Sequence, residues 1–169
     1  MKISISDGVE GGLVRTRVVA TLLWVVVICS PMASAKDVAL ISNKANHVEA
    51  LTLAELVKIC KGQTGRWQDG KPVTLVMRDP ASPEMKVVLQ KIYELPKEDV
   101  AVLIANANHN RQNHPAIIVV DSDEALVKKV ESTTGAVGLV DVYAITSGVT
   151  VVRVDSKLPL EPGYAMHGN

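Results

Sequence analysis

The sequence has no phenylalanine, and aromatic residues make up only 3% of its 169 residues. Its formal net charge at pH 7 is zero, because 18 Lys and Arg balance 18 Asp and Glu. Proteins that bind nucleic acids usually carry a basic excess and aromatic rings on which bases stack. We therefore expect no nucleic-acid partner, and a core built mainly from Val, Ile, Leu and Ala.

Motifs that mark common enzyme and metal sites are also missing. The sequence contains no G-x-S-x-G nucleophile elbow, no P-loop and no Cys–His pair in a catalytic context. His109 and His114 stand five residues apart, which matches no standard spacing of metal ligands. We expect no enzymatic activity, no cofactor and no metal.

One apolar run without charge, Val18 to Ile28, lies near the start of the chain. Two arginines precede it and an Ala-Ser-Ala sequence ending at Ala35 follows it, which is the pattern of a cleaved secretory signal. A membrane anchor is the alternative, but a spanning helix needs about 20 apolar residues. We predict an N-terminal extension plus a cleaved signal peptide over 1–35, and a periplasmic or secreted domain over 36–169.

Cysteine is scarce, with one residue on each side of the predicted cleavage site. Cleavage after Ala35 removes Cys29 and leaves Cys60, which excludes a disulfide within the mature chain. Cys60 shares one face of a predicted helix with Leu56 and Val57. We interpret it as a small buried apolar residue, with a reactive thiol as the alternative.

Hydrophobic patterning predicts strands that alternate with helices. The expected strands cover 37–42, 73–77, 117–120, 136–140 and 149–154, and the expected helices cover 51–60, 82–94, 97–106 and 122–132. Thr52 and Glu55 form a capping box, and Ser82 and Ser122 are N-cap candidates. Pro83 suits the first helical position. This alternation predicts one α/β domain with a partly parallel sheet.

The segment 78–83 (Arg-Asp-Pro-Ala-Ser-Pro) joins a predicted strand to a predicted helix. Ligands of open α/β sheets bind outside the carboxyl ends of strands, and helix N-termini suit oxyanions. Arg78 can give a bidentate contact to phosphate or carboxylate, and Ser82 can donate its hydroxyl. The alternative is structural: Ser82 caps the helix, and Arg78 pairs with Asp79 or is exposed.

Two further segments are candidates for anion contacts. The Thr-Thr-Gly sequence at 133–135 could meet an anion, or it is a plain turn between a helix and a strand. Lys58, Lys61, Arg66 and Lys71 lie around the end of the first predicted helix. They form either a basic rim for an anion or acidic partner, or a solvated face.

Two segments resemble phosphate-binding proteins of ABC importers, and in particular short standalone members of that family. Residues 51–62 read L-T-L-A-E-L-V-K-I-C-K-G and residues 67–73 read W-Q-D-G-K-P-V. They are similar to the family pattern L-T/S-x-x-E-L-x-x-I-F-x-G-K-x-x-x-W-x-D-G-x-x-V. Residues 134–140, T-G-A-V-G-L-V, are similar to its x-P-G-A-I-G-Y-V entry to a strand. The resemblance implies a single periplasmic-binding-protein-like α/β lobe, with a mixed sheet flanked by helices.

The resemblance also implies a small oxyanion ligand, phosphate first, and a membrane transporter or periplasmic protein as partner. In full-length relatives an R-x-D-G-S-G-T segment at a helix start grips phosphate, and its contacts carry over to Arg78, Asp79 and Ser82. Pro83 and Glu84 stand where the family has Gly and Thr. A periplasmic accessory or interaction module that has lost ligand binding is the alternative.

Overall fold

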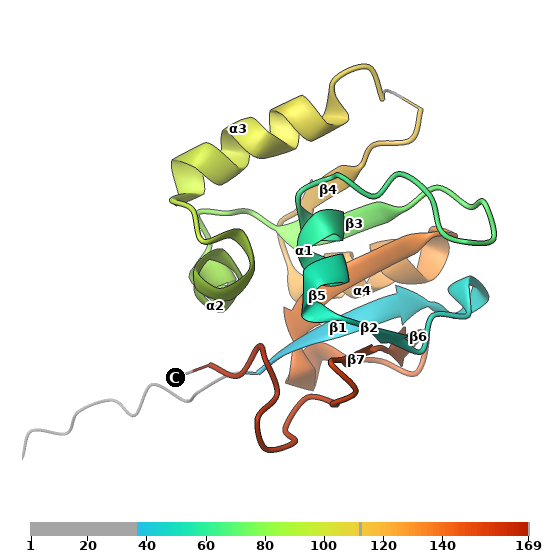
Figure 1. Cartoon of the computed structure of the whole chain (residues 1–169), viewed down its shortest axis with the longest axis vertical. Helices are drawn as coiled ribbons and strands as arrows, with labels where there is room; N and C mark the ends of the chain where they lie inside the picture. Colours follow the sequence, from blue (N-terminus) through green and yellow to red (C-terminus); the bar gives the residue numbers. More distant parts are fainter. Residues whose placement is uncertain (1–36, 112, 169) are drawn as a thin grey trace, which may run out of the picture. The chain divides into compact units, whose positions relative to one another are not determined.

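The computed structural model describes residues 37–111 and 113–168 (Figure 1). The predicted signal peptide and its cleavage site lie outside these residues. The strands are β1 (Val38–Asn43), β2 (Ala50–Leu51), β3 (Thr74–Arg78), β4 (Ile117–Val120), β5 (Ala136–Asp141), β6 (Val149–Val151) and β7 (Arg153–Val154). The α-helices are α1 (Leu53–Cys60), α2 (Lys86–Val88), α3 (Lys97–Asn108) and α4 (Asp123–Ser132). Short 3-10 segments cover Lys44–Asn46, Pro83–Met85 and Val142–Ala144, and a π-helical turn covers Leu89–Tyr93.

A five-stranded sheet with the order β4-β3-β5-β1-β6 forms the centre of the described residues. β3 runs parallel to both β4 and β5, whereas β1 runs antiparallel to β5 and β6. β2 and β7 form a separate parallel pair. The predicted α/β fold with a mixed sheet flanked by helices is confirmed. None of the described helices combines the length and apolar character needed to cross a membrane.

Helices cover both faces of the sheet, and the strands feed a core on each side. Leu75 and Met77 of β3 are buried in the core that α1 and the π-helical turn share. Val76 between them is buried in the second core, against Leu126 of α4. Successive side chains of a strand point to opposite faces, so the continuous apolar run of β3 is buried on both. Figure 1 shows α1 in front of the sheet and α4 behind it.

Several local predictions are confirmed to the residue. The capping box is present, since the Thr52 N–H donates to Glu55 Oε2 over 2.8 Å and the Glu55 N–H donates to Thr52 Oγ1 over 3.2 Å. Ser122 caps α4 by accepting from the Ala125 N–H over 3.1 Å. Strand β4 has the predicted bounds. In each case the residues that decide the structure are near neighbours in the chain.

The predicted strand 149–154 is interrupted at one residue, and the first helix begins two residues later than predicted, for one shared reason. Leu51 is not helical, because it belongs to β2, which pairs with β7. The last strand is interrupted at Val152, whose N–H donates to Leu40 O over 2.8 Å. The next N–H, on Arg153, instead donates to Glu49 O over 3.0 Å. The chain thus leaves β1 and continues along β2, a change of partner that local patterning does not encode.

The predicted helix 82–94 is present but irregular. It begins as a 3-10 turn with Pro83 at its start, becomes α-helical at Lys86 and widens into the π-helical turn. It ends at Glu94, which has a left-handed φ of 53°. The wider turn carries Tyr93 inward, where its hydroxyl donates to Cys60 O over 2.9 Å and burial raises its pKa. Helix α3 then runs two residues beyond its predicted end.

The C-terminal residues pack against the start of β1. The Val38 N–H donates to Met166 O over 3.1 Å, and the Tyr164 hydroxyl donates to Val38 O over 2.9 Å. His167 Nδ1 pairs with Asp37, whose side chain is buried. The two ends of the described chain are therefore held side by side.

An asparagine on α3 covers part of the exposed edge of the sheet. Strand β4 is an edge strand. The Asn108 side chain accepts from the Ile117 N–H over 3.0 Å and donates to Ile117 O over 2.7 Å. The amide thus takes the place of a neighbouring strand at Ile117. It satisfies backbone groups that would otherwise be free to pair with a strand of another chain.

We expect Asn108→Ala to lower the free energy of unfolding by about 2 kcal/mol, because two partly buried hydrogen bonds are lost at about 1 kcal/mol each. Asn106→Ala is the matched control, since Asn106 lies exposed on the same helix. Urea unfolding followed by circular dichroism measures both variants. Equal stabilities of the two variants would contradict the edge-covering role.

Candidate functional site

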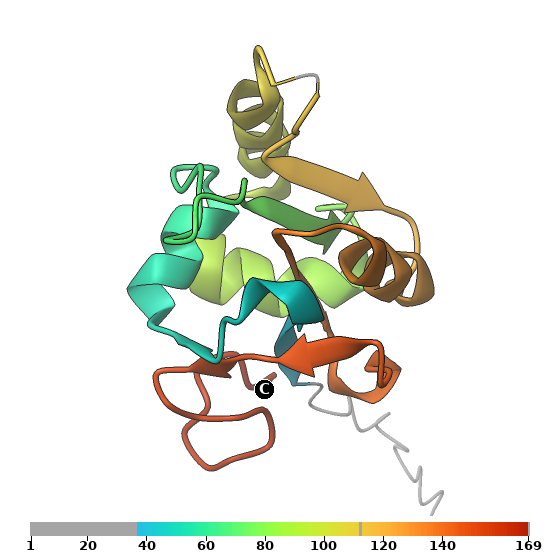
Figure 2. The same cartoon turned by 90° about the vertical axis from the view of Figure 1, so that its right-hand side faces the viewer.

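The predicted site segment lies where two neighbouring parallel strands end and their connections diverge. β3 ends at Arg78 and leads toward α2 on one face, while β4 ends at Val120 and leads into α4 on the other. Such a divergence leaves a crevice at the carboxyl ends of the strands, the usual ligand position in open α/β sheets. Figure 2 shows the same strands and helices from the side.

Arg78 lies at this end of the strands, with two carboxylates around its guanidinium group. Its Nη1 donates to Asp123 Oδ1 over 2.8 Å, and its Nη2 lies 3.7 Å from Glu84 Oε2. The side chain is only 16% exposed. The suggested pairing with Asp79 is therefore wrong, because the partners of Arg78 are Asp123 and Glu84. Nε of Arg78 is buried and has no hydrogen-bond partner among the described residues.

Ser82 occupies the predicted N-cap position but does not cap with its side chain. Its backbone is extended, and Pro83 follows at the first helical position as predicted. Its Oγ forms no capping hydrogen bond, so the structural interpretation of this hydroxyl is wrong. In the part of the chain that the structure describes, Ser82 Oγ and Arg78 Nε are the two buried side-chain polar atoms without a partner.

Asp79 forms the turn between Arg78 and Ser82. Its Oδ1 accepts from the Ala81 N–H over 2.7 Å, and its backbone oxygen accepts from the Ser82 N–H over 2.9 Å. The residue is exposed. Asp79 therefore fixes the backbone that presents Ser82, and its Oδ2 has no hydrogen bond to a described residue.

The surroundings of Arg78 are acidic. Glu124 follows Asp123 at the start of α4, and its pKa is lowered by the hydrogen bond to its own backbone N–H, by the Ser122 hydroxyl and by the positive charge of Arg78. Sequence reasoning missed Asp123 as a partner of Arg78. A signal existed, since Asp123 follows the end of a strand, but the order of the strands was needed to place it beside β3.

An apolar cavity of about 380 Å³ opens next to the turn. Asp79, Pro80 and Ala81 form one wall, and Ala101 and Ile104 of α3 lie opposite. Hydrocarbon surface and the exposed carboxylate of Asp79 therefore lie beside the turn that follows Arg78.

The second candidate loop, 133–135, is a structural turn. The Gly135 N–H donates to Asn46 Oδ1 over 2.7 Å, and Gly135 O accepts from Trp67 Nε1 over 2.9 Å. The first of these bonds uses the Gly135 N–H, a donor that an anion bound at this loop would need. The bond from the Trp67 indole to Gly135 O also links the W-x-D-G turn to the T-G turn, so the two segments that resemble the family pattern are in direct contact.

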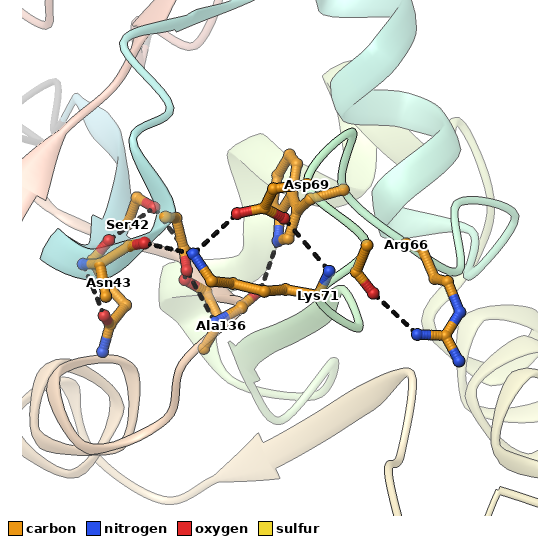
Figure 3. Close-up of polar contacts among 11 residues, drawn as sticks. Ser42, Asn43, Arg66, Asp69, Lys71 and Ala136 are labelled. Atoms are coloured by element: carbon orange, nitrogen blue, oxygen red, sulfur yellow. Dashed lines mark hydrogen bonds and ion pairs between the residues drawn. The ribbon is translucent and has the colours of Figure 1, made fainter.

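Lys71 of the predicted basic rim is committed to structural contacts. Its Nζ lies 2.7 Å from Asp69 Oδ2 and donates to Ala45 O over 2.7 Å (Figure 3). Arg66 turns away from them, and its Nη1 donates to Gly70 O over 2.7 Å. The predicted rim is therefore divided, with Arg66 on a different side of the turn from Lys71.

Cys60 is fully buried, as its helical face predicted, and burial raises the pKa of its thiol. A thiol in such surroundings stays protonated and unreactive. Among the described residues, no group of three His, Cys, Asp or Glu side chains is arranged to hold a metal ion.

Comparison with known proteins gives structural matches only. No protein-family model matches the chain, and no curated protein does. An ABC-type phosphate transport receptor from Vibrio cholerae matches with a TM-score of 0.64 at 19% identity, over 79% of this chain and 54% of that one. PstS from Borrelia burgdorferi matches with a TM-score of 0.60 at 16% identity, over 79% and 55%.

A third solved structure, a phosphate-binding protein from Stenotrophomonas maltophilia, matches with a TM-score of 0.59 at 18% identity. It is covered over 40% of its length by 74% of this chain. The chain thus spans about half the length of these structures or less. In fold, it resembles one portion of the phosphate-binding proteins of ABC transport systems, which confirms the predicted periplasmic-binding-protein-like architecture.

Proposed function

We propose that this chain is an exported, single-lobed binding protein for a small oxyanion, with phosphate as the first candidate. Arg78, Ser82 and Asp79 are the proposed contacts. The observation that carries the proposal is that the two buried unpartnered polar atoms belong to Arg78 and Ser82. A buried polar atom without a partner costs about 1–3 kcal/mol, so these two atoms favour a ligand whose oxygen atoms pair with them.

The acidic surroundings bear on which oxyanion fits. Glu84 and Asp123 place two carboxylates around the guanidinium of Arg78, and Asp79 adds a third on the adjoining turn. A fully ionised anion is repelled by them, whereas hydrogen phosphate carries an O–H that a carboxylate oxygen can accept. Sulfate has no such proton near neutral pH. We therefore expect phosphate to bind more tightly than sulfate.

The balance of charge also limits the affinity. Two of the three guanidinium nitrogens of Arg78 already face carboxylates. Pro83 lacks an N–H that a bound phosphate would use. The chain covers about half the length of its structural matches. We propose weak binding by the isolated chain, or tighter binding when a partner protein, such as a membrane transporter or a periplasmic protein, completes the site.

Calorimetric titration of residues 36–169 with phosphate, sulfate and acetate tests the proposal. Saturable heat with phosphate, smaller or absent with sulfate, supports it. Absence of heat with every oxyanion at millimolar concentration would overturn it for the isolated chain. N-terminal sequencing of the protein recovered from the periplasm tests export, with Lys36 as the expected first residue.

Ser82→Ala separates a ligand-binding role from a structural one. We expect this variant to be about 1 kcal/mol more stable than the parent without ligand, because it removes a buried unsatisfied hydroxyl. We expect it to bind phosphate about tenfold more weakly, through loss of one donor. The matched control is Ser122→Ala, which removes the α4 cap and should cost about 1 kcal/mol. Loss of stability in Ser82→Ala would assign that hydroxyl to the fold instead.

A periplasmic accessory module without ligand is the second candidate, and one observation favours it. The 2.8 Å contact between Arg78 and Asp123 satisfies the strongest donor of the site internally. In an accessory module, the carboxylate of Asp123 would take the place of the oxyanion beside Arg78. Cross-linking in intact cells tests the accessory role: a reproducible adduct together with no phosphate binding supports it, and recovery of monomer alone opposes it.

A further inference from the structure

A second cavity, of about 800 Å³, lies at the opposite end of the sheet from Arg78. Gly65, Arg66 and Pro72 form one side of it, and Arg111, Asn113 and His114 form the other. Pro72 and Val73 precede β3, whereas Arg78 ends it, so the length of a strand separates the two places. We call this cavity the Arg66–Arg111 pocket.

The charge of the Arg66–Arg111 pocket has one sign. None of the described residues that line it is acidic. Within the described ranges, neither Arg66 nor Arg111 forms an ion pair with a carboxylate, in contrast to Arg78. His114 adds a ring that can donate through an N–H. Two unneutralised guanidinium groups on facing walls give this pocket the stronger positive field of the two.

A hydrogen bond positions the guanidinium group of Arg66, and that of Arg111 lies near the same turn. Nη1 of Arg66 donates to Gly70 O over 2.7 Å, as Figure 3 shows, and this leaves Nε and Nη2 for a ligand. Nη2 of Arg111 lies 3.8 Å from where a Cβ on Gly65 would stand, so its side chain reaches across to the turn that carries Arg66.

The walls that carry these groups are tied to the rest of the fold. The turn of Arg66 is fixed by the bond from Trp67 Nε1 to Gly135 O and by the contacts of Lys71. On the other side, Thr74 Oγ1 donates to Pro115 O over 3.0 Å. The wall that carries Arg66 is therefore held in place before a ligand binds, which reduces the conformational entropy lost on binding.

We infer that the Arg66–Arg111 pocket binds a small organic anion through a phosphate or carboxylate group. Planar guanidinium groups match both kinds of oxyanion bidentately. The volume lies in the range of small-molecule pockets, so the anionic group can be carried on a larger organic body. This inference is independent of the oxyanion proposed for Arg78, because Arg78, Asp79 and Ser82 do not line the Arg66–Arg111 pocket.

The test is an NMR titration of ¹⁵N-labelled residues 36–169 with inorganic phosphate, glycerol 3-phosphate and citrate in separate experiments at low salt. We expect saturable shifts of the amides of Gly65, Arg66 and Arg111 with at least one organic anion. Arg66→Gln and Arg111→Gln should each weaken binding about tenfold, the loss of one charge-assisted hydrogen bond. Arg153→Gln, an exposed arginine on β7, is the control and should change nothing.

The outcomes separate the sources of the anion and the two sites. Glycerol 3-phosphate binding without citrate binding assigns the pocket to phosphate esters, and the reverse assigns it to carboxylates. Arg78→Ala should leave these shifts unchanged. The inference is overturned if no probe shifts the pocket amides at millimolar concentration, or if Arg111→Gln binds as tightly as the parent.

Discussion

Gly135→Ala is expected to lower the free energy of unfolding by about 4 kcal/mol, close to the whole stability of a marginal domain. Gly135 has a φ of +87°, and a Cβ atom there would stand 2.0 Å from Pro72 O. The clash is with backbone, so no side-chain rotation relieves it. Backbone strain at this φ costs about 1–3 kcal/mol.

The clash also breaks hydrogen bonds that join separate parts of the chain. The Gly135 N–H donates to Asn46, and its carbonyl accepts from Trp67 Nε1 over 2.9 Å and from the Thr74 N–H over 3.3 Å. Each bond contributes about 1 kcal/mol. Because these bonds tie the β1 end, the W-x-D-G turn and the start of β3 together, displacement of Gly135 loosens all three.

Gly70→Ala is the matched control for Gly135→Ala. Gly70 has a similar φ of +84°, but a Cβ atom there meets nothing within 4 Å. Its expected cost is therefore the left-handed strain alone, about 1–2 kcal/mol. Urea unfolding of the two variants measures the difference. If Gly135→Ala and Gly70→Ala are equally stable, the contact with Pro72 does not constrain the fold.

Arg78→Ala is expected to weaken phosphate binding about a hundredfold or more. Truncation of one partner in a desolvated, hydrogen-bonded charge pair costs about 2–5 kcal/mol, and 1.4 kcal/mol is tenfold in affinity. The substitution removes the proposed Nε donor, and it also leaves Asp123 and Glu84 without their cation, which adds repulsion toward an anion.

Two further variants keep this second prediction open to refutation. Arg78→Lys retains a charge but loses the guanidinium fork, so we expect an intermediate affinity. Arg153→Ala removes an exposed arginine from β7 and should bind as the parent does. Circular dichroism confirms that each variant is folded before titration calorimetry. Unchanged phosphate affinity in folded Arg78→Ala would exclude the surroundings of Arg78 as the phosphate site.

Sequence reasoning succeeded where neighbouring residues decide the structure. The capping box at Thr52 and the cap at Ser122 depend on residues three positions away. Strand β4 follows from a run of β-branched residues between a proline and an aspartate. These features were predictable because the interacting atoms are fixed relative to one another by a single turn of chain.

It failed where distant residues decide the structure. Leu51 is a strand residue because of Val154, more than a hundred positions away. Arg78 meets Asp123 because β4 lies beside β3, and no local pattern specifies that order. The Arg66–Arg111 pocket joins Arg66 of the predicted basic rim to the loop between α3 and β4, and no local pattern specifies that contact either. The segment that carries the candidate site was predictable, but its partners were not.

The most direct test of the oxyanion site observes the Nε–H group of Arg78 itself. In a ¹⁵N-labelled sample of residues 36–169, its side-chain cross-peak is assigned by its absence from Arg78→Lys. Because Nε is buried without a partner, we predict a saturable shift of this cross-peak as phosphate is added, and a smaller shift with sulfate. A cross-peak that does not move at millimolar phosphate would contradict the proposal that Arg78 Nε donates a hydrogen bond to a bound oxyanion.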